Sequence, residues 1–159
     1  MLEGIWHVAF HVADIDRSIA FYEALGMALV HRQEQSNAYT SSLVGYPDAA
    51  IRVAQFALPG ADPGVSRHHL ELVEYVTPAV QSIPLERRTA GTAHLAFRVA
   101  DIAAEYGRLR DAGVVFVSQP NEITAGVNRG GFACYLLDPD GITLELVQPP
   151  VRREDAASA

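Results

Sequence analysis

Cysteine is nearly absent from this sequence, and so is any surplus of positive charge. The single cysteine, Cys134, cannot form an intrachain disulfide framework or a cysteine-based zinc site. Twelve basic residues stand against 19 acidic ones, and the formal charge of -7 disfavours nucleic-acid partners because phosphate binding needs clustered Lys and Arg. No apolar run approaches the ~18 residues that span a bilayer. We therefore expect a cytoplasmic protein with neither a membrane nor a nucleic acid as its partner.

Apolar residues, by contrast, are plentiful enough for a real core. Hydrophobic residues make up 49% of the 159 positions and charged residues 19%, which is too apolar a balance for a disordered chain. This length is close to that of one ordinary domain. The sequence predicts a single domain over residues 1–150, followed by a flexible tail over residues 151–159.

The chain contains an internal repeat. Residues 7–30 align without a gap with residues 94–117, and seven of the first nine aligned positions are identical. A second match follows later, where Leu70-Glu71-Leu72-Val73 recurs as Leu144-Glu145-Leu146-Val147. Two segments that share both their beginnings and their ends indicate a duplicated structural module. We place the modules at about residues 5–76 and 92–149.

Each module has the same predicted order of elements, β-α-β-β-β, which makes the fold class α+β. The first strand (5–12 or 92–99) leads to an Asp able to cap a helix, Asp14 or Asp101, and the helix ends at Gly26 or Gly113. Three strands follow in each module. They are expected near 28–34, near 38–44 or 50–57, and near 68–75 in the first module, and near 115–118, 132–137 and 142–147 in the second. Residues 77–83 are predicted to form a short helical linker.

One His and one Glu recur on the same strand face of both modules. Because alternate strand residues point to opposite faces, His7 and Glu71 lie opposite the apolar positions, and so do His94 and Glu145. If the two half-sheets curl toward each other, these four side chains line one cleft, and a cation is a common means of holding carboxylates together. A strand His is more often simply hydrogen-bonded or exposed. The recurrence of both residue types in both repeats nevertheless favours a metal site.

With these residues the sequence resembles the vicinal-oxygen-chelate (glyoxalase / bleomycin resistance / extradiol dioxygenase) superfamily, and within it glyoxalase I and methylmalonyl-CoA epimerase. The resemblance covers residues 5 to about 149. It rests on the His7 strand with Asp14 and Phe21-Tyr22, the Glu71 strand, the His94 strand, and Asp138-Pro139-Asp140-Gly141 ahead of the Glu145 strand. It implies two tandem βαβββ modules that form a curved mixed sheet around a metal-binding cleft. One divalent ion (Zn, Ni, Co, Mn or Fe(II)) would be bound there by His7, Glu71, His94 and Glu145.

The resemblance also implies a chemistry. A cation that chelates two vicinal oxygens of a small-molecule substrate stabilises the enediolate left when a neighbouring C–H loses its proton. Glu145, with Glu71 as the second candidate, would be the base. This predicts a lyase, isomerase or epimerase. Two alternatives stay open: an Fe(II) extradiol ring-cleaving dioxygenase, which needs only two His and one carboxylate, and a non-catalytic protein that binds a drug or metabolite.

Other polar residues carry weaker predictions. His11, His69 and Arg98 share the ligand face, and Arg129 lies in a glycine-rich stretch, so all four are candidate substrate contacts; a solvated polar rim explains them equally well. His68 and His69 are adjacent and cannot serve one ion from the same strand face. A symmetric homodimer is expected from the resemblance and from the exposed sheet edges. No motif specific for glutathione or coenzyme A is found, and the substrate stays open.

Overall fold

The computed structural model describes residues 1–151, and it separates into two compact units, Met1–Ile83 and the part of the chain from Pro84 onward. Each unit contains one of the two sequence repeats and is described here by itself. The prediction of one domain over residues 1–150 depends on how the units pack together, and it stays a prediction. The predicted flexible tail falls, beyond Val151, outside the described residues.

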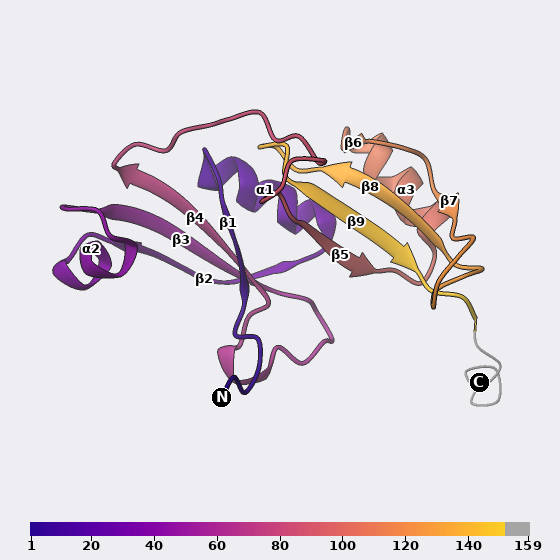
Figure 1. The fold of residues 1–159 in the computed structure, drawn as a ribbon, viewed down its shortest axis with the longest axis horizontal. Helices are drawn as coiled ribbons and strands as arrows, with labels where there is room; N and C mark the ends of the chain where they lie inside the picture. The colour runs from indigo at the N-terminus through magenta and orange to yellow at the C-terminus, as the bar shows by residue number, and fades with distance from the viewer. Residues whose placement is uncertain (152–159) are drawn as a thin grey trace. The chain divides into compact units, whose positions relative to one another are not determined.

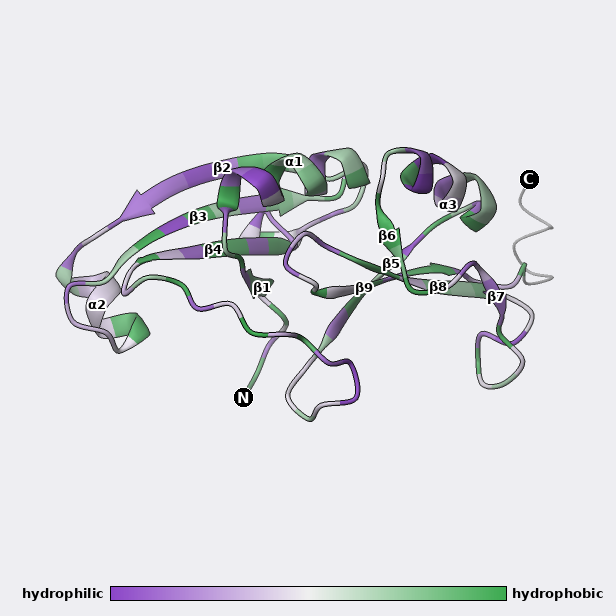
Figure 2. Ribbon diagram, turned by 90° about the horizontal axis from the view of Figure 1, so that it is seen from above, coloured by the Kyte–Doolittle hydropathy of each residue, from purple (hydrophilic) through white to green (hydrophobic). Residues whose placement is uncertain are grey.

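The first unit is built on a mixed sheet with the strand order β1-β4-β3-β2 (Figure 1). Its strands are β1 (Val8–His11), β2 (Ala28–Gln35), β3 (Ala50–Ala57) and β4 (Leu70–Thr77). β1 runs parallel to β4, and the other neighbours are antiparallel. The edge strand β2 is largely hydrophilic (Figure 2), which suits a strand with one unpaired side. The remaining elements are the helices α1 (Ile15–Leu25) and α2 (Ala38–Val44) and the short 3-10 helix η1 (Gly64–Ser66).

Helix α1 covers one face of this sheet (Figure 2). The Asp14 side chain caps its first turn by accepting from the backbone N–H groups of Asp16 and Arg17. Gly26 ends it in the left-handed conformation (φ 108°), which glycine adopts without steric cost. The buried face of the helix presents Ile15, Ile19 and Tyr22, and the sheet side of this core holds the fully buried Phe56, Leu70 and Leu72. Local capping and the apolar stripe predicted from the sequence therefore produce the expected helix.

The second unit repeats this plan. Its strands are β5 (His94–Arg98), β6 (Val115–Phe116), β7 (Asn121–Glu122), β8 (Phe132–Leu137) and β9 (Thr143–Gln148), and its helix is α3 (Ile102–Asp111). The sheet order is β5-β9-β8-β6, with β7 also paired to β8. β5 runs parallel to β9 as β1 does to β4. Asp101 caps α3 through the N–H of Ala104. The α+β class is confirmed; the first unit has its strands in the predicted βαβββ order, and the second adds the two-residue strand β7 to it.

The strand predicted at either 38–44 or 50–57 is found at the second of these positions, as β3 (Ala50–Ala57). Residues 38–44 form helix α2 instead, because Asn37 caps its first turn through the N–H of Thr40 and Gly45 ends it. The helical linker predicted over residues 77–83 is absent from the described structure. There β4 continues to Thr77, and a turn and irregular backbone follow. Pro78 lacks a backbone N–H and Pro84 disfavours a helical residue before it, so this segment is a poor helix.

Smaller differences concern element ends. Helix α3 ends at Asp111 with Ala112 in the cap position, one residue earlier than the predicted cap at Gly113, which follows in the left-handed conformation (φ 87°). The strand predicted near 115–118 is limited to Val115–Phe116, and β7 was not predicted. Across residues 1–151, every helix is too short or too polar to cross a membrane.

Candidate metal centre

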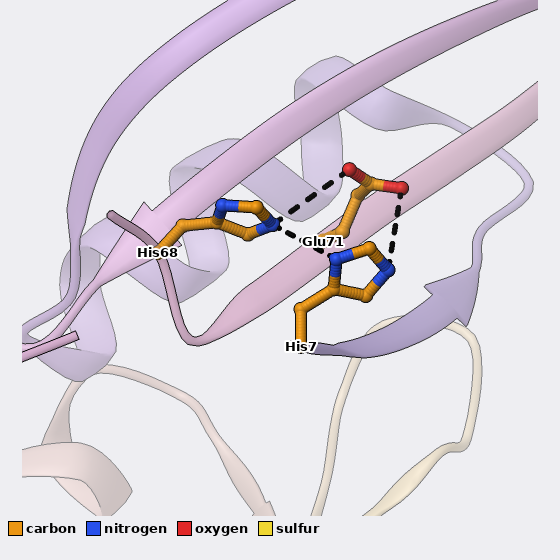
Figure 3. A group of neighbouring side chains, drawn as sticks. All are labelled: His7, His68 and Glu71. Atoms are coloured by element: carbon orange, nitrogen blue, oxygen red, sulfur yellow. Dashed lines mark hydrogen bonds and ion pairs between the residues drawn. The ribbon is translucent and has the colours of Figure 1, made fainter. Parts of the chain in front are cut away.

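Three side chains of the first unit converge on one point: His7, His68 and Glu71 (Figure 3). Each offers one ligand atom, and these atoms all lie within 4.8 Å of one another. His7 stands immediately before β1, and Glu71 is the second residue of β4. The parallel pairing of these strands, which sets Ala9 opposite Glu71, brings the His7 Nε2 to 3.8 Å from the Glu71 Oε1. The sheet register thus assembles the first pair of predicted ligands.

The Glu71 carboxylate is held by a neighbouring strand. Gln55 lies opposite Glu71 on β3, and its Nε2 donates a hydrogen bond of 2.9 Å to the Glu71 Oε2. The flanking Leu70 and Leu72 are fully buried on the α1 side, whereas the Glu71 side chain is 17% exposed. The carboxylate therefore has one oxygen fixed by an amide, and its other oxygen faces His7.

His68 is a member of this cluster that the sequence analysis missed. It is buried, with an exposed fraction of 4%, and its Nε2 lies 3.0 Å from the His7 Nδ1 and 3.9 Å from the Glu71 Oε2. His69, which strand alternation predicts on the ligand face, accepts a hydrogen bond at its Nδ1 from the N–H of Leu58, and its role as a substrate contact stays a prediction. Because β4 begins only at Leu70, alternation does not govern the side chain of His68.

The second unit brings together the other two predicted ligands. His94 is the first residue of β5, Glu145 lies on β9, and the His94 Nε2 is 3.1 Å from the Glu145 Oε2. The register sets Ala96 opposite Glu145, as Ala9 stands opposite Glu71 in the first unit. Tyr135 pairs with Glu145 from β8, and its ring packs edge-on against His94 at 5.3 Å. In each unit, the predicted histidine ligand therefore turns its Nε2 toward the predicted carboxylate ligand.

The turn before β9 fixes where Glu145 stands. Asp138 is buried, and its Oδ1 accepts hydrogen bonds from the N–H groups of Asp140 (2.9 Å) and Ile142 (2.8 Å). Gly141 takes the left-handed conformation (φ 81°) that this turn requires. The Asp138–Gly141 motif identified in the sequence is thus a rigid turn from which the Glu145 strand starts.

The charge of Glu145 also acts on the neighbouring strand. Cys134, on β8, is 3% exposed, and burial together with the Glu145 carboxylate raises the pKa of its thiol from 9.0 to about 11. Burial is the larger cause, since it disfavours the charged thiolate. The thiol is therefore protonated at neutral pH.

Each unit has a pocket that contains a predicted ligand or substrate contact. In the second unit a pocket of about 330 Å³ is lined by His94, Tyr135, Thr143, Thr92 and two cationic side chains, Arg87 and Arg88. In the first unit a pocket of about 450 Å³ contains His11, Tyr46 and Tyr75. There the Tyr75 ring stands edge-on to both His11 (5.5 Å) and Tyr46 (6.0 Å). Of the predicted substrate contacts, His11 thus lines a pocket with aromatic walls.

The two predicted arginines are not brought into either ligand group. Arg98 is exposed at the end of β5, in the position that His11 occupies in the first repeat. Arg129 is exposed in the loop before β8, and its backbone N–H donates to the Gly126 carbonyl at 3.3 Å. Their roles as substrate contacts stay predictions.

The donor sets fit a divalent cation by their chemistry. Imidazole nitrogen and carboxylate oxygen together suit Zn, Ni, Co, Mn and Fe(II), and the predicted set would supply two of each. Inside the first unit, His7, His68 and Glu71 alone are close enough to hold an ion. Joint binding by His7, Glu71, His94 and Glu145 requires both units and stays a prediction.

Comparison with known proteins relates both repeats to one family. The family model described as Glyoxalase/Bleomycin resistance protein/Dioxygenase superfamily matches residues 4–146. A 2-epi-5-epi-valiolone epimerase from Actinomyces sp is 33% identical, over 92% of this chain and 80% of its own length. A probable lactoylglutathione lyase from Vibrio cholerae is 28% identical, over 91% of this chain and 89% of its own length.

Solved structures agree on the fold. A glyoxalase family protein from Bacillus cereus superposes with a TM-score of 0.78 at 22% identity, covering 95% of this chain and 97% of that protein. The trypanothione-dependent glyoxalase I of Leishmania major gives a TM-score of 0.65 at 22% identity, covering 99% of this chain and 94% of that one. The named sequence relatives are enzymes, an epimerase and lyases. The chain belongs to the Glyoxalase/Bleomycin resistance protein/Dioxygenase superfamily, as its sequence resemblance indicated.

Proposed function

We propose that this protein is a divalent-metal-dependent enzyme of the lyase, isomerase or epimerase type, which moves a proton beside a metal-chelated carbonyl of a small molecule. The observation that carries the proposal is the recurrence, in each unit, of an imidazole Nε2 facing a carboxylate at the same register position. The proposed ligands are His7, Glu71, His94 and Glu145. The epimerase and lyase relatives support this class of reaction.

The proposed chemistry needs a positive centre to stabilise the negative charge that forms on the carbonyl oxygen. A bound divalent cation supplies this as a Lewis acid. A lysine Schiff base is the other common way of stabilising a carbanion, but the sequence contains no lysine. The residues of this chain therefore favour the metal-assisted route.

Among the carboxylates, Glu145 is the better candidate for the base. Glu71 is anchored by the Gln55 amide at 2.9 Å and faces two imidazoles, which suits a ligand that stays in place. Among the described residues, the polar side-chain partner of the Glu145 carboxylate is His94, whose Nε2 lies at 3.1 Å. A carboxylate without an amide anchor can move from ligand to proton acceptor at lower cost. Glu145 would take the proton from the carbon beside the carbonyl, and Glu71 is the second candidate.

The neighbouring pockets would hold the rest of the substrate. Arg87 and Arg88 beside His94 offer permanent positive charge to an anionic group. His11, with Tyr46 and Tyr75, offers ring faces and hydrogen-bonding groups to an uncharged portion. Arg98 and Arg129 are proposed as further polar contacts. A substrate with vicinal oxygens at one end matches the ligand groups.

One observation favours a second candidate function. His7, His68 and Glu71 form, inside the first unit, a group of two imidazoles and one carboxylate. That composition is typical of Fe(II) oxygenases with open coordination positions. An extradiol dioxygenase is therefore the runner-up. The paired His and Glu residues argue against a non-catalytic drug or metabolite binder.

The test combines metal analysis with solvent isotope exchange. The purified protein is stripped with a chelator and reloaded separately with Zn, Ni, Co, Mn or Fe(II). It is then incubated in deuterated water with 2-epi-5-epi-valiolone or with lactoylglutathione. We expect metal-dependent deuterium uptake at the carbon beside the carbonyl of at least one compound. Uptake that is equal with and without metal would contradict the proposal. Oxygen consumption with catechols and Fe(II) would support the dioxygenase instead.

A further inference from the structure

His68 is a buried imidazole that the proposed chemistry does not use. It has no counterpart in the second repeat, where the matched Leu-Glu-Leu-Val segments set Ile142 at the equivalent position. Its exposed fraction is 4%, and both of its ring nitrogens are engaged. This buried histidine therefore has two specific hydrogen-bond partners, and one of them is the proposed ligand His7.

The first partner of His68 decides where its proton lies. The His68 Nδ1 is 2.8 Å from the backbone carbonyl oxygen of Ser66. A carbonyl can only accept, so the Nδ1 must carry the proton and donate it. A neutral imidazole has one N–H, and the Nε2 of His68 is therefore left with a lone pair.

The proton position on His68 determines the proton position on its second partner, His7. The His68 Nε2 lies 3.0 Å from the His7 Nδ1, and a hydrogen bond between two nitrogens needs one proton. Because the His68 nitrogen is the acceptor, the His7 Nδ1 donates. The Nε2 of His7 then presents its lone pair, and this is the nitrogen that faces the Glu71 Oε1 at 3.8 Å.

The second repeat supports the same choice of nitrogen independently. There the His94 Nε2, not its Nδ1, approaches the carboxylate of Glu145, at 3.1 Å. In both units the Nε2 is thus the nitrogen turned toward the candidate cation site. In the first unit this leaves the His7 Nδ1 free to serve as the donor to His68.

We infer that His68 is a positioning residue that holds His7 in the tautomer required of a metal ligand, through the chain of hydrogen bonds Ser66 carbonyl, His68, His7. This inference rests on the proposed function in one respect, that His7 binds the ion. The backbone segment that carries His68 is held in place by Ser66. The Ser66 Oγ lies within hydrogen-bond distance of the carbonyls of Pro63 (2.9 Å) and His68 (2.7 Å), which fixes the backbone that supplies the acceptor.

The experiment compares two variants of His68 with one control. His68→Leu removes the acceptor and replaces the imidazole with an apolar side chain of similar bulk. His68→Gln keeps an oxygen able to accept from the His7 Nδ1–H. His31→Gln changes an exposed histidine on the edge strand β2 and serves as the control. All are the full chain, and thermal melting of each metal-free protein verifies that it is folded.

Two readouts are taken, and the first needs neither metal nor substrate. Nitrogen-15 NMR of the metal-free protein reports which His7 nitrogen bears the proton. We expect Nδ1–H in the wild type, in His31→Gln and in His68→Gln, and a mixture of tautomers in His68→Leu. The second readout is the dissociation constant for Co(II), measured by competition with a chelator. We expect binding about 10–100-fold weaker in His68→Leu, largely restored in His68→Gln.

The results that would overturn the inference are distinct. If metal-free wild type has its His7 proton on Nε2, or if His68→Leu leaves the tautomer unchanged, His68 does not position His7. If the visible spectrum of bound Co(II) shows one imidazole fewer in both His68 variants, His68 is itself a ligand. Failure of the proposed function looks different, since His7→Ala would then bind Co(II) as tightly as wild type while the tautomer result stands.

Discussion

Replacing Glu145 with Gln tests the assignment of the base most directly. The amide keeps the shape of the side chain and an oxygen donor, but it cannot accept a proton as a carboxylate does. We expect Glu145→Gln to retain most of its metal and to exchange the substrate proton with solvent about 10²–10⁴-fold more slowly. This loss corresponds to about 3–5 kcal/mol of barrier. The matched variant Glu71→Gln alters the carboxylate that Gln55 anchors, so we expect it to weaken metal binding more than proton exchange.

The structure supplies an internal check on this variant. The Glu145 carboxylate is the smaller of two causes that raise the pKa of the Cys134 thiol to about 11. In Glu145→Gln that pKa should fall, yet stay above 9.0, because burial is the larger cause and is unchanged. The ultraviolet absorbance of the thiolate, followed against pH in the folded protein, measures this pKa without any substrate. If metal-bound Glu145→Gln exchanges the substrate proton at the wild-type rate, Glu145 is not the base and Glu71 becomes the candidate. If both Glu145→Gln and Glu71→Gln exchange it normally, the extradiol dioxygenase becomes the favoured function.

Four further predictions concern metal, thiol, helix and assembly. His94→Ala should lose stoichiometric metal, since removal of one of four ligands weakens affinity severely; full occupancy by elemental analysis would contradict the four-ligand site. Cys134 should resist iodoacetamide at pH 8 in the folded protein and react in denaturant; fast labelling of the folded protein would contradict this. The free energy of unfolding should fall above about pH 9, because the thiol of the unfolded chain ionises there and the buried thiol does not. Asp14→Ala should lower the free energy of unfolding by about 0.5–2 kcal/mol, measured with urea, through loss of the α1 cap, whereas Asp14→Asn should retain most of it. A symmetric homodimer is expected from sedimentation, and the exposed Trp6 offers a fluorescence signal for it; a monomer at micromolar concentration would count against it.

Much of the fold could be predicted from neighbours along the chain. Asp14 and Asp101 cap helices because an Asp side chain reaches N–H groups two or three residues ahead. Glu71 is only partly buried beside the fully buried Leu70 and Leu72 because strand residues alternate. The same local logic left residues 38–44 and 50–57 as alternatives for one strand; the cap at Asn37 makes the first stretch a helix, and the second is the strand.

The tertiary structure alone decided which side chains meet. His68 and His7 are 61 positions apart, and they touch because β1 pairs in parallel with β4 in one register. No repeat marks His68, since Ile142 takes its place in the second module, and it precedes the strand whose alternation would have placed it. The two modules, the Asp caps of their helices and the His and Glu of each repeat could be predicted from the amino-acid sequence, because these depend on local patterns and their repetition. The contact of His68 with His7, and the tautomer it imposes, depend on long-range strand pairing that local patterns do not encode.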